Sequence, residues 1–597
     1  MFFVGAFTLF ASLIFVYGYG VSAYFPQPFW QWWYFLWWYG GFYPDIDRWL
    51  LISAIPAAAL PGSVIIVWLI QKPKIGGWSL RRNPSATAAV RAPIRGTTDN
   101  FGHARWMTLA EARRLWPGPD PAYGGIVVGE AYDPREDAVA NIPFEPRNPQ
   151  TWGKGGEAPL LIDPCHDGST HSLALCGSGG FKTTSCISTL LTWTGAAVVL
   201  DPSCELSPML TEDIQRRDHR VFTLHPNTAE TVGFNALDWI DITSPMAETD
   251  IAAVVEWICG DTPGTDATAA FFRGRGKALV TCLLAHILWN TEMEGDLKNL
   301  RALRRMIVKP EGELKELLSE IHRSSPSRLA RDLAGTLKGL ADETFSGAYA
   351  NADECTGWLS NRAFAGLVSG TSFRSSAITR GSTTVFIALP LKALQATPAV
   401  ARTIVGALLN AAYEADGNVQ GRVLFLLDEA ARLGPMSILA TARDAGRKYG
   451  ITLHMIYQSL SQITEQFGGE GKKAWIEAAS WISYAAIKDP DTAKELAEIC
   501  GQHGVIGWSE SENKGTHGRA MEAGSRSRGT ALTYSEAPRY LIRHEEIMHD
   551  LREDVALVVP KRGRPLLCGR AIYFRRDGLR SRVSANRFAT RKELTDG

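Results

Sequence analysis

The sequence predicts an α/β protein built around a doubly wound parallel sheet, and two segments carry this prediction. Residues 423–434 read VLFLLDEAARLG, in which five apolar residues run directly into Asp428 and Glu429. Such a continuous apolar run is typical of a strand that is buried on both faces of a parallel sheet. Residues 171–185 read HSLALCGSGGFKTTS, a second apolar run followed by glycines, a lysine and hydroxyls. Both strands therefore end in polar residues at the carboxyl edge of the sheet, where open α/β folds bind ligands.

Further strand-like segments lie between and after these two, and most of them end in polar, Pro or Gly residues. They cover residues 197–202, 220–226, 383–390, 451–459 and 481–490. Helix-like patterns follow them, and strands that alternate with helices predict a parallel sheet. The order of these features along the chain is that of a RecA-like domain. A glycine-rich loop comes first, followed by a strand ending in Asp201, the acidic strand and a strand ending in Gln458.

The glycine-rich segment is interpreted as a phosphate-binding loop. Its glycines let backbone N–H groups turn towards phosphate oxygens, and the helix that follows directs its positive end to the same place. We expect Lys182 to reach the β- and γ-phosphates of a nucleotide and Thr183 to ligate the magnesium ion. Cys176 and Phe181 stand where such loops usually carry glycine, so a turn without a ligand is the alternative. The expected nucleotide-binding residues here are Gly177, Ser178, Gly179, Gly180, Phe181, Lys182, Thr183 and Thr184.

Asp428 and Glu429 form the second half of the expected site. Asp428 is expected to support the magnesium ion that accompanies the nucleotide, and Glu429 to polarise the attacking water. Together with the loop, this pair predicts ATP and Mg²⁺ as cofactors. The alternative is a buried strand whose acidic residues merely begin the next helix, since acidic side chains favour the first helical turn.

Two residues after the acidic strand fit the same chemistry. Arg447, in DAGRKYG, lies just before the next strand and is expected to reach the nucleotide of a neighbouring subunit as an arginine finger. Gln458 ends that next strand and is expected to sense the γ-phosphate or to orient the attacking water. The alternatives are a basic helix end, worth about 0.3–1 kcal/mol, and an ordinary polar strand end.

Two uncharged stretches at the amino terminus, residues 2–25 and 50–70, each have the length of about 20 residues that a membrane-spanning helix needs. The first lacks a basic amino-terminal region, which argues against a cleaved signal and for two membrane-spanning helices. Only Arg48 is basic in the aromatic-rich loop between them, which is interpreted as an interfacial belt or a docking surface. The second stretch is followed by Lys72, Lys74, Arg81, Arg82, Arg91 and Arg95. This asymmetry predicts that the main domain and both termini are cytoplasmic.

A length of 597 residues is too great for a single core and predicts several domains. Residues 1–75 are assigned to a membrane anchor with a short periplasmic loop, and residues 76–261 to the first part of the nucleotide-binding domain. Residues 262–370 are assigned to an all-α insertion that recognises cargo or caps the motor. Residues 371–597 complete the nucleotide-binding domain with the acidic strand, the finger and carboxyl-terminal strands. The helices of the insertion are expected at 274–290, 300–308, 311–322 and 328–340.

Composition narrows the function further. Lys plus Arg and Asp plus Glu both number 62, so the whole chain is not a nucleic-acid-binding polycation. The nine cysteines include no CxxC pair and fit a reducing cytoplasm, and the 12 histidines show no paired metal-ligand spacing. Residues 504–539 are polar and are interpreted as a solvated loop. Basic residues near the carboxyl terminus are expected to form a solvated face or to contact nucleic-acid phosphates. They are Lys561, Arg562, Arg564, Arg575, Arg576, Arg580 and Arg582.

Several motifs follow the two uncharged stretches in a defined order. They are FGHARWMT at 101–108, GSGGFKTTS at 177–185, VVLDPSCEL at 198–206, GFNALDWID at 233–241, LFLLDEAARLG at 424–434 and GRKYGITLHMIYQSLSQ at 446–462. Together they resemble the coupling proteins of type IV secretion and conjugation, and most closely the TraG proteins of conjugative plasmids. The resemblance covers nearly the whole chain.

This resemblance implies a hexameric ATPase, anchored in the bacterial inner membrane, that links a relaxase–DNA complex to the channel proteins of a type IV secretion system. Its partners are then a relaxase and its relaxosome and single- or double-stranded DNA, with the all-α subdomain helping to recognise cargo. The family places a finger arginine and a sensor glutamine about nineteen and about thirty residues after the acidic pair, as Arg447 and Gln458 stand here. Asp201 and Glu205 match a second acidic motif near the nucleotide, and Thr170 stands where some relatives place an arginine.

Two other functions fit part of these observations. A DNA translocase of the FtsK type shares the motor, but it normally has more membrane spans and a carboxyl-terminal winged-helix reader, neither of which the sequence indicates. A docking scaffold that binds nucleotide poorly, because Phe181 replaces a glycine, differs by lacking magnesium-dependent ATP binding.

Overall fold

The computed structural model describes residues 2–19, 30–71, 74–75, 78–79, 94–96, 98, 100–177, 179–260, 266–517 and 525–586. Ser178, one of the expected nucleotide-binding residues, lies outside these ranges. The chain divides into two compact units. One comprises Met1–Arg95 and Val505–Ser535, and the other comprises Gly96–Gly504 and Glu536–Gly597.

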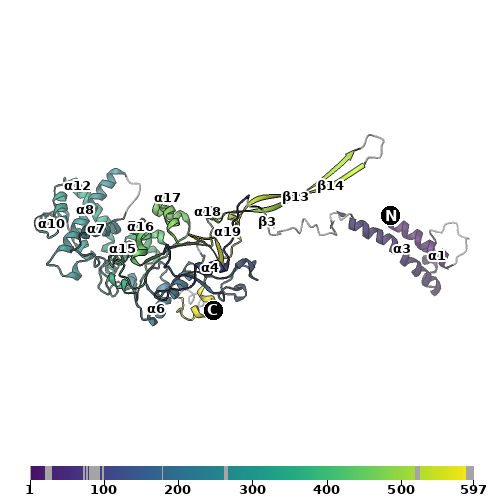
Figure 1. Ribbon diagram of the computed structural model, residues 1–597, viewed down its shortest axis with the longest axis horizontal. Helices are drawn as coiled ribbons and strands as arrows, with labels where there is room; N and C mark the ends of the chain where they lie inside the picture. The colour runs from purple at the N-terminus through teal and green to yellow at the C-terminus, as the bar shows by residue number, and fades with distance from the viewer. Residues whose placement is uncertain are drawn as a thin grey trace. The chain divides into compact units, whose positions relative to one another are not determined.

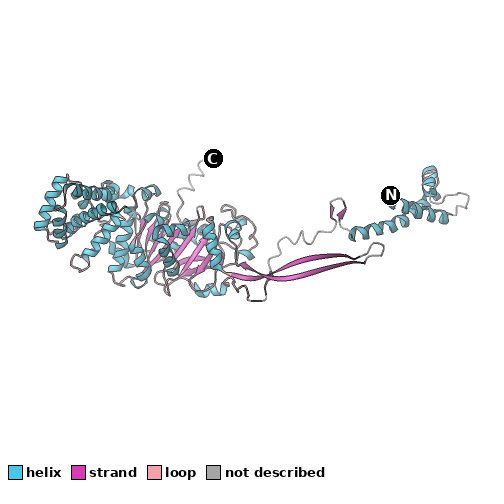
Figure 2. Cartoon of the chain, turned by 90° about the horizontal axis from the view of Figure 1, so that it is seen from above, coloured by secondary structure: helices cyan, strands magenta, loops and turns pink. Residues whose placement is uncertain are grey.

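The second unit is built on an eleven-stranded sheet (Figure 2). In spatial order its strands are β5 (Leu160–Asp163), β4 (Ile126–Glu130), β16 (Leu566–Gly569), β15 (Val555–Pro560), β12 (Trp481–Ala485), β6 (Ser172–Cys176), β11 (Ile451–Tyr457), β10 (Val423–Leu427), β7 (Ala196–Leu200), β9 (Thr383–Ile387) and β8 (Arg220–Leu224). The strands from β12 to β8 are parallel. The remaining strands, from β5 to β15, extend the sheet in antiparallel order.

The parallel strands confirm the predicted α/β class, because every expected strand segment forms one of them. All five residues of the acidic strand β10 are fully buried. Phe425 packs into the core on one face of the sheet, whereas Leu424 and Leu426 pack into the core on the other. Successive side chains of a strand point to opposite faces, so a strand covered on both sides is apolar throughout.

Helices cover both faces of this sheet (Figure 2). The helices α5 (Lys182–Thr192) and α6 (Leu206–Arg216) contribute Leu190 and Met209 to the core that contains Leu424. The helix α15 (Pro398–Glu414) contributes Ile404 and Val405 to the core that contains Phe425. Each parallel strand is therefore held between two apolar layers.

The described residues between 247 and 367 form a series of helices, which gather beyond the end of the sheet (Figure 1). Helix α7 (Ala247–Cys259) precedes the expected insertion at 262–370. The helices within those bounds are α8 (Ala267–Trp289), α9 (Leu300–Ile307), α10 (Glu311–Ser324), α11 (Arg328–Lys338), α12 (Asp342–Thr356) and α13 (Arg362–Leu367). Between Ala247 and Leu367 the described residues form no strand. The helices α8 to α11 match the four expected segments, while α7, α12 and α13 were not expected.

The prediction of a solvated loop at 504–539 is wrong. The chain there forms two long strands, β13 (Gln502–His517) and β14 (Ser525–Tyr540), which lie in one sheet with β3 (Ile94–Arg95). Their sequence has no regular apolar alternation, the signal by which a half-buried strand is recognised. The strands are neighbours in this sheet through backbone pairing, which leaves no mark on composition.

The amino-terminal unit contains α1 (Phe2–Tyr19), α2 (Gln31–Tyr39) and α3 (Pro44–Gln71). Two of these helices cover most of the uncharged stretches, although residues 20–25 lie outside the described ranges. The segment expected as an aromatic loop contains the helix α2, whose Trp32 indole donates to Ser53 Oγ at 3.0 Å. Among the described residues, no helix combines the length and the apolar character needed to cross a membrane.

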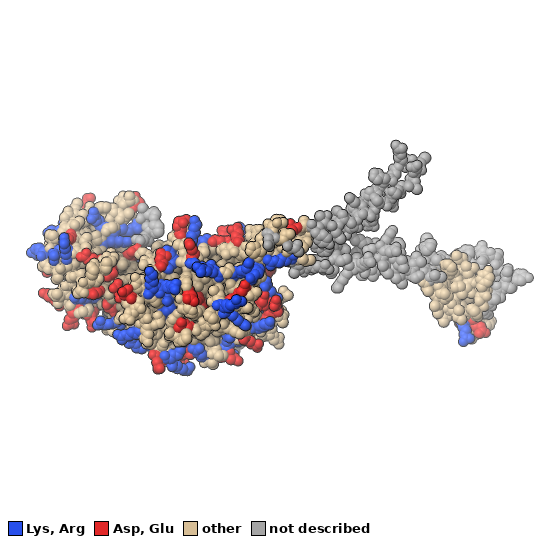
Figure 3. All heavy atoms as spheres, viewed as in Figure 1, with Lys and Arg blue, Asp and Glu red and all other residues tan. Residues whose placement is uncertain are grey.

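Acidic and basic side chains are interspersed over the face of the second unit shown in Figure 3. No large area of a single charge is visible on that face, in keeping with the balanced composition.

Candidate functional site

The phosphate loop connects β6 to α5 at the carboxyl edge of the sheet. Gly179 has a φ of 75°, and a Cβ there would meet no atom within 4 Å. A Cβ on Gly180 would lie only 2.6 Å from Cys176 Sγ, so only glycine fits at that position. Phe181 has a φ of 56°, a left-handed conformation that costs a non-glycine residue about 1–2 kcal/mol. The loop is thus a tight turn that opens directly into a helix.

Packing around Phe181 offsets this strain. Its ring meets the ring of Phe144 edge to face, with centroids 5.5 Å apart. The guanidinium of Arg575 lies 5.4 Å from the centroid of the Phe144 ring. Aromatic pairs of this kind contribute about 0.5–1.5 kcal/mol beyond the area that they bury. A bulky residue therefore occupies the usual glycine position because a neighbouring loop provides a partner for it.

The buried side chain of Arg570 clamps the same loop. It donates to the carbonyl oxygen of Gly180, to that of Phe181 at 3.1 Å and to Ser185 Oγ at 3.0 Å. Sequence reasoning missed this residue, because a single arginine after β16 carries no local motif. Arg575 donates in turn to the Arg570 carbonyl at 2.7 Å.

The carboxyl-terminal basic residues expected as a solvated face are partly internal, which corrects that expectation. Arg575 pairs with Asp554 at 2.7 Å, and both side chains are buried. Arg576 pairs with the buried Glu130 at 3.0 Å. The ion pairs offset part of the desolvation of these charges, although burial still raises the pKa of Glu130. They also tie the carboxyl-terminal segment to the sheet.

Glu429 lies between Lys182 and Gln458. The Lys182 ammonium forms an ion pair with Glu429 Oε1, and both side chains are 14% exposed. Gln458 Nε2 donates to Glu429 Oε1 at 2.9 Å and to Oε2 at 3.1 Å. Burial acts to raise the pKa of Glu429, but the hydrogen bonds from Lys182 and Gln458 outweigh it and hold the pKa below its usual value. The glutamate is therefore ionised at neutral pH.

Asp428 differs from its neighbour because it is buried. Its oxygen Oδ1 accepts the Glu429 backbone N–H at 3.0 Å, and the residue is 6% exposed. Burial raises the pKa of Asp428 to about 6, with the Lys182 charge opposing the shift and the Glu429 charge adding to it. Two adjacent carboxylates thus differ in acidity, the pattern by which acid–base roles are divided in active sites.

The residues of the second acidic motif, Asp201 and Glu205, form hydrogen bonds with other parts of the chain. Asp201 accepts the Leu206 backbone N–H at 2.9 Å and the Ser203 hydroxyl at 2.7 Å, which satisfies the amino end of α6. Glu205 accepts a hydrogen bond from Asn586 at 3.3 Å. Asp201 still acts electrostatically, since its charge contributes to the raised pKa of Asp428.

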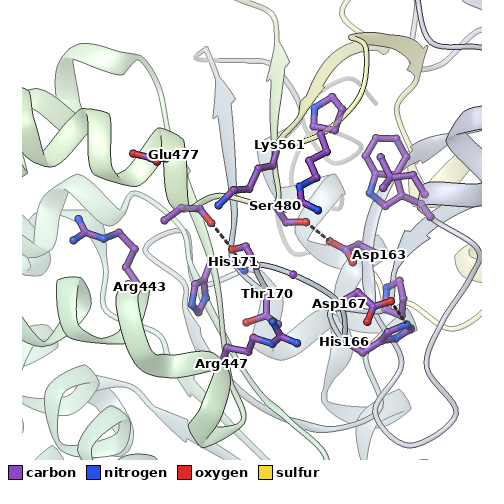
Figure 4. A pocket seen from close by; sticks show the side chains of 18 of the residues that line it. Asp163, His166, Asp167, Thr170, His171, Arg443, Arg447, Glu477, Ser480 and Lys561 are labelled. Atoms are coloured by element: carbon purple, nitrogen blue, oxygen red, sulfur yellow. Dashed lines mark hydrogen bonds and ion pairs between the residues drawn. The ribbon is translucent and has the colours of Figure 1, made fainter.

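Arg447 does not join this cluster within one chain. It lies just before β11, and Gln458 lies just after it. The seven residues of β11 span roughly 20 Å at about 3.3 Å per residue. The exposed Arg447 instead lines a cavity of about 810 Å³ at the amino edge of the parallel strands (Figure 4).

Thr170 lines the same cavity. The buried Arg422 donates to Thr170 Oγ1 at 3.0 Å, to Thr452 Oγ1 at 2.8 Å and to the Ile451 carbonyl at 2.7 Å. A guanidinium from a different segment therefore lies beside Thr170 at this edge of the sheet.

One parallel strand is followed by a glycine loop and a basic helix start, another by an acidic pair, and the strand between them by a glutamine. This arrangement defines a RecA-like P-loop nucleotide-binding protein. Residues 122–597 match the family model described as Type IV secretory system Conjugative DNA transfer. The chain belongs to this family, the coupling proteins that serve conjugative DNA transfer through type IV secretion.

Known relatives agree with this assignment. The conjugal transfer protein TraG of Agrobacterium fabrum is 45% identical over 509 residues, which cover 84% of this chain and 75% of that protein. The type IV secretion system-coupling protein VirD4 of Bartonella henselae is 42% identical, over 82% of this chain and 75% of its own length. A solved structure of the plasmid coupling protein TrwB with the ATP analogue ADPNP has the same fold. Its TM-score is 0.55 at 15% identity, over 81% of this chain and 95% of that one.

Proposed function

We propose that the cluster of Lys182, Glu429 and Gln458 is the ATP-hydrolysing site of this coupling protein. The observation that carries the proposal is the position of Glu429, held between a cation and an amide at the carboxyl ends of neighbouring strands. Solved TrwB structures contain an ATP analogue in one case and ADP with Mg²⁺ in another, which supports the same ligands here.

The residues present fit such a ligand. Gly179 faces open space, Lys182 supplies a cation, and Thr183 and Asp428 supply the oxygen atoms that Mg²⁺ prefers. The remaining members of the expected loop, Gly177, Ser178, Gly180, Phe181 and Thr184, complete the phosphate cradle, and Asp201 and Glu205 add acidic charge nearby. When bound, Mg²⁺ neutralises charge on the phosphates.

The protein residues divide the chemistry between them. Lys182 exchanges its ion pair with Glu429 for contact with the phosphates, which leaves the glutamate available to accept a proton from water. Gln458 holds both oxygens of that carboxylate and so orients it. Asp428 is proposed to support the Mg²⁺ in its ionised form, which the charge of Lys182 favours.

Arg447 is proposed to act on the nucleotide of a neighbouring subunit. One chain carries the phosphate loop and Arg447 at opposite edges of its sheet, so a complete site needs two chains in head-to-tail contact. Repeated head-to-tail contacts form a ring when the rotation between subunits closes, and a closed hexamer is the proposed state.

The amino-terminal unit is proposed to anchor the protein in the bacterial inner membrane through two spans within residues 1–75, with the main domain in the cytoplasm. Residues 76–261 and 371–597 then form the motor, and residues 262–370 receive the relaxase with its DNA for delivery to the channel. A reporter fused after residue 40 and another fused at the carboxyl terminus test the topology. Opposite sides of the membrane are expected, and reporters on one side contradict two spans.

ATP binding, ATP hydrolysis and plasmid transfer test the site assignment together. Lys182→Ala is expected to lose Mg²⁺-dependent ATP binding, while Glu429→Gln retains binding and loses DNA-stimulated hydrolysis. Both variants are expected to fail in transfer. If both leave hydrolysis and transfer unchanged, the site is wrongly assigned. If the parent protein shows no magnesium-dependent ATP binding, the docking-scaffold function is correct instead.

A further inference from the structure

The cavity that contains Arg447 brings together residues from several strands. Thr170, Arg447 and Ser480 lie just before the parallel strands β6, β11 and β12. Lys561 and Arg562 follow β15, which runs antiparallel to β12 and therefore ends at the same edge. Figure 4 shows Arg447 and Lys561 on the wall of this cavity.

The turn that carries Lys561 and Arg562 is fixed on both sides. The Lys561 backbone N–H donates to the Ser480 carbonyl at 2.8 Å, and the Met107 N–H donates to the Pro565 carbonyl at 2.8 Å. Arg564 donates from its guanidinium to the His103 carbonyl at 3.2 Å. Because the backbone is held in this way, the two exposed side chains start from fixed positions at the cavity, which lowers the entropy lost on binding a ligand.

The cations in this cavity differ in what they already bind. Arg443 is engaged, since it pairs with Asp444 at 2.7 Å and lies 5.4 Å from the centroid of a Trp475 ring. The side chains of Arg447, Lys561 and Arg562 have no hydrogen bond or ion pair with any residue that the structure describes. Three uncommitted cations around one cavity suit an anion with several charges, such as a polyphosphate.

We propose that Lys561 and Arg562 act with Arg447 on the phosphates of the nucleotide held by the adjacent subunit. This inference rests on the proposed function, because it needs Arg447 to face that nucleotide. Arg447 then contacts the transferred phosphate, and the turn at 561–562 adds positive charge from the opposite wall. Each cation stabilises the negative charge that spreads over the phosphoryl group as it is transferred.

Removing both charges is expected to lower kcat while leaving assembly intact. Lys561→Ala/Arg562→Ala should reduce DNA-stimulated hydrolysis at least about tenfold, whereas Lys561→Arg/Arg562→Lys, which keeps both charges, should stay within about threefold of the parent. Full hydrolysis by the alanine variant contradicts the proposal.

Mixed assemblies separate action across subunits from a structural role. The full-length alanine variant is co-expressed with Glu429→Gln, each with its own affinity tag, and assemblies containing both are purified. If the two variants assemble at random, about a quarter of the subunit contacts contain a complete site. In these contacts the intact Glu429 of one subunit faces the intact Lys561 and Arg562 of its neighbour. We expect these assemblies to hydrolyse ATP faster than either variant alone. A mixture of Glu429→Gln with Lys182→Ala is the matched control and should not recover, since both lesions lie in the same half of the site.

A parallel mixture of Glu429→Gln with Arg447→Ala separates the role proposed for the turn at 561–562 from the role proposed for Arg447. If this mixture recovers and the Lys561/Arg562 mixture does not, the proposal for the turn fails and the finger assignment stands. If neither mixture recovers, the arrangement across subunits fails, and the role proposed for the turn fails with it.

Discussion

The Lys182 ammonium meets the Glu429 carboxylate at the carboxyl edge of the sheet, although 247 positions separate them in the chain. The strands β6 and β10 that precede them are separated only by β11, and Gln458 at the end of β11 completes the cluster. In the proposed site a bound phosphate would compete with Glu429 for the Lys182 ammonium, which would link nucleotide binding to the release of the glutamate.

Gln458→Ala is expected to shift the acidic limb of the pH–rate profile to higher pH. The hydrogen bonds from Gln458 help to hold the pKa of Glu429 below its usual value, so their loss raises that pKa. More of the glutamate is then protonated at a given pH, and less is available as a base. Steady-state hydrolysis measured across pH 4–8 at saturating ATP tests this, and an unchanged acidic limb in a variant that still hydrolyses ATP contradicts it.

Asp428→Asn is expected to stabilise the fold and to abolish magnesium-dependent hydrolysis. Burial raises the pKa of Asp428 from 3.8 to about 6, so its contribution to stability is fully present below pH 4 and is lost as the pH rises through 6. At pH 8 the ionised carboxylate therefore costs about 2–3 kcal/mol of folding free energy, which the amide avoids.

Thermal unfolding at pH 8 and at pH 4 checks this prediction. The gain in Tm should be present at pH 8 and should disappear at pH 4, where the parent Asp428 is protonated. A lower Tm at pH 8 contradicts the expected cost of the charge.

Much of this site is predictable from sequence because the carboxyl ends of parallel strands meet at one edge. Long apolar runs identify β6, β10 and β11, and the residues that follow each run must then be neighbours. Arg570 and Phe144 lie outside any motif, and each acts through contacts that only the folded chain creates. The ribbon of β13 and β14 escaped prediction because its sequence has no regular apolar alternation.

Phe144→Ala is expected to weaken Mg²⁺–ATP binding up to about tenfold, because Phe181 loses the ring that offsets its left-handed backbone. In a Phe181→Gly background the same substitution should have little effect, since glycine adopts a positive φ without strain. Equilibrium ATP titration of the four proteins forms a double-mutant cycle. Equal losses in both backgrounds show that Phe144 acts independently of Phe181.

Arg570→Ala is expected to destabilise the protein by about 2–4 kcal/mol and to weaken ATP binding. The substitution leaves the Gly180 and Phe181 carbonyls without their buried donor. Arg580→Ala, at an exposed position in the same terminal segment, is the matched control and should change stability by less than about 0.5 kcal/mol. Denaturant unfolding measures both, and equal effects contradict a specific role for Arg570.

The most direct measurement compares Glu429→Gln with the parent protein for Mg²⁺–ATP affinity and for the rate of a single turnover in the same preparation. The account predicts that affinity stays within about threefold while the single-turnover rate falls at least about a hundredfold, because the substitution removes the base and keeps the phosphate cradle. A single-turnover rate equal to that of the parent would contradict the assignment of Glu429, and with it the proposed site.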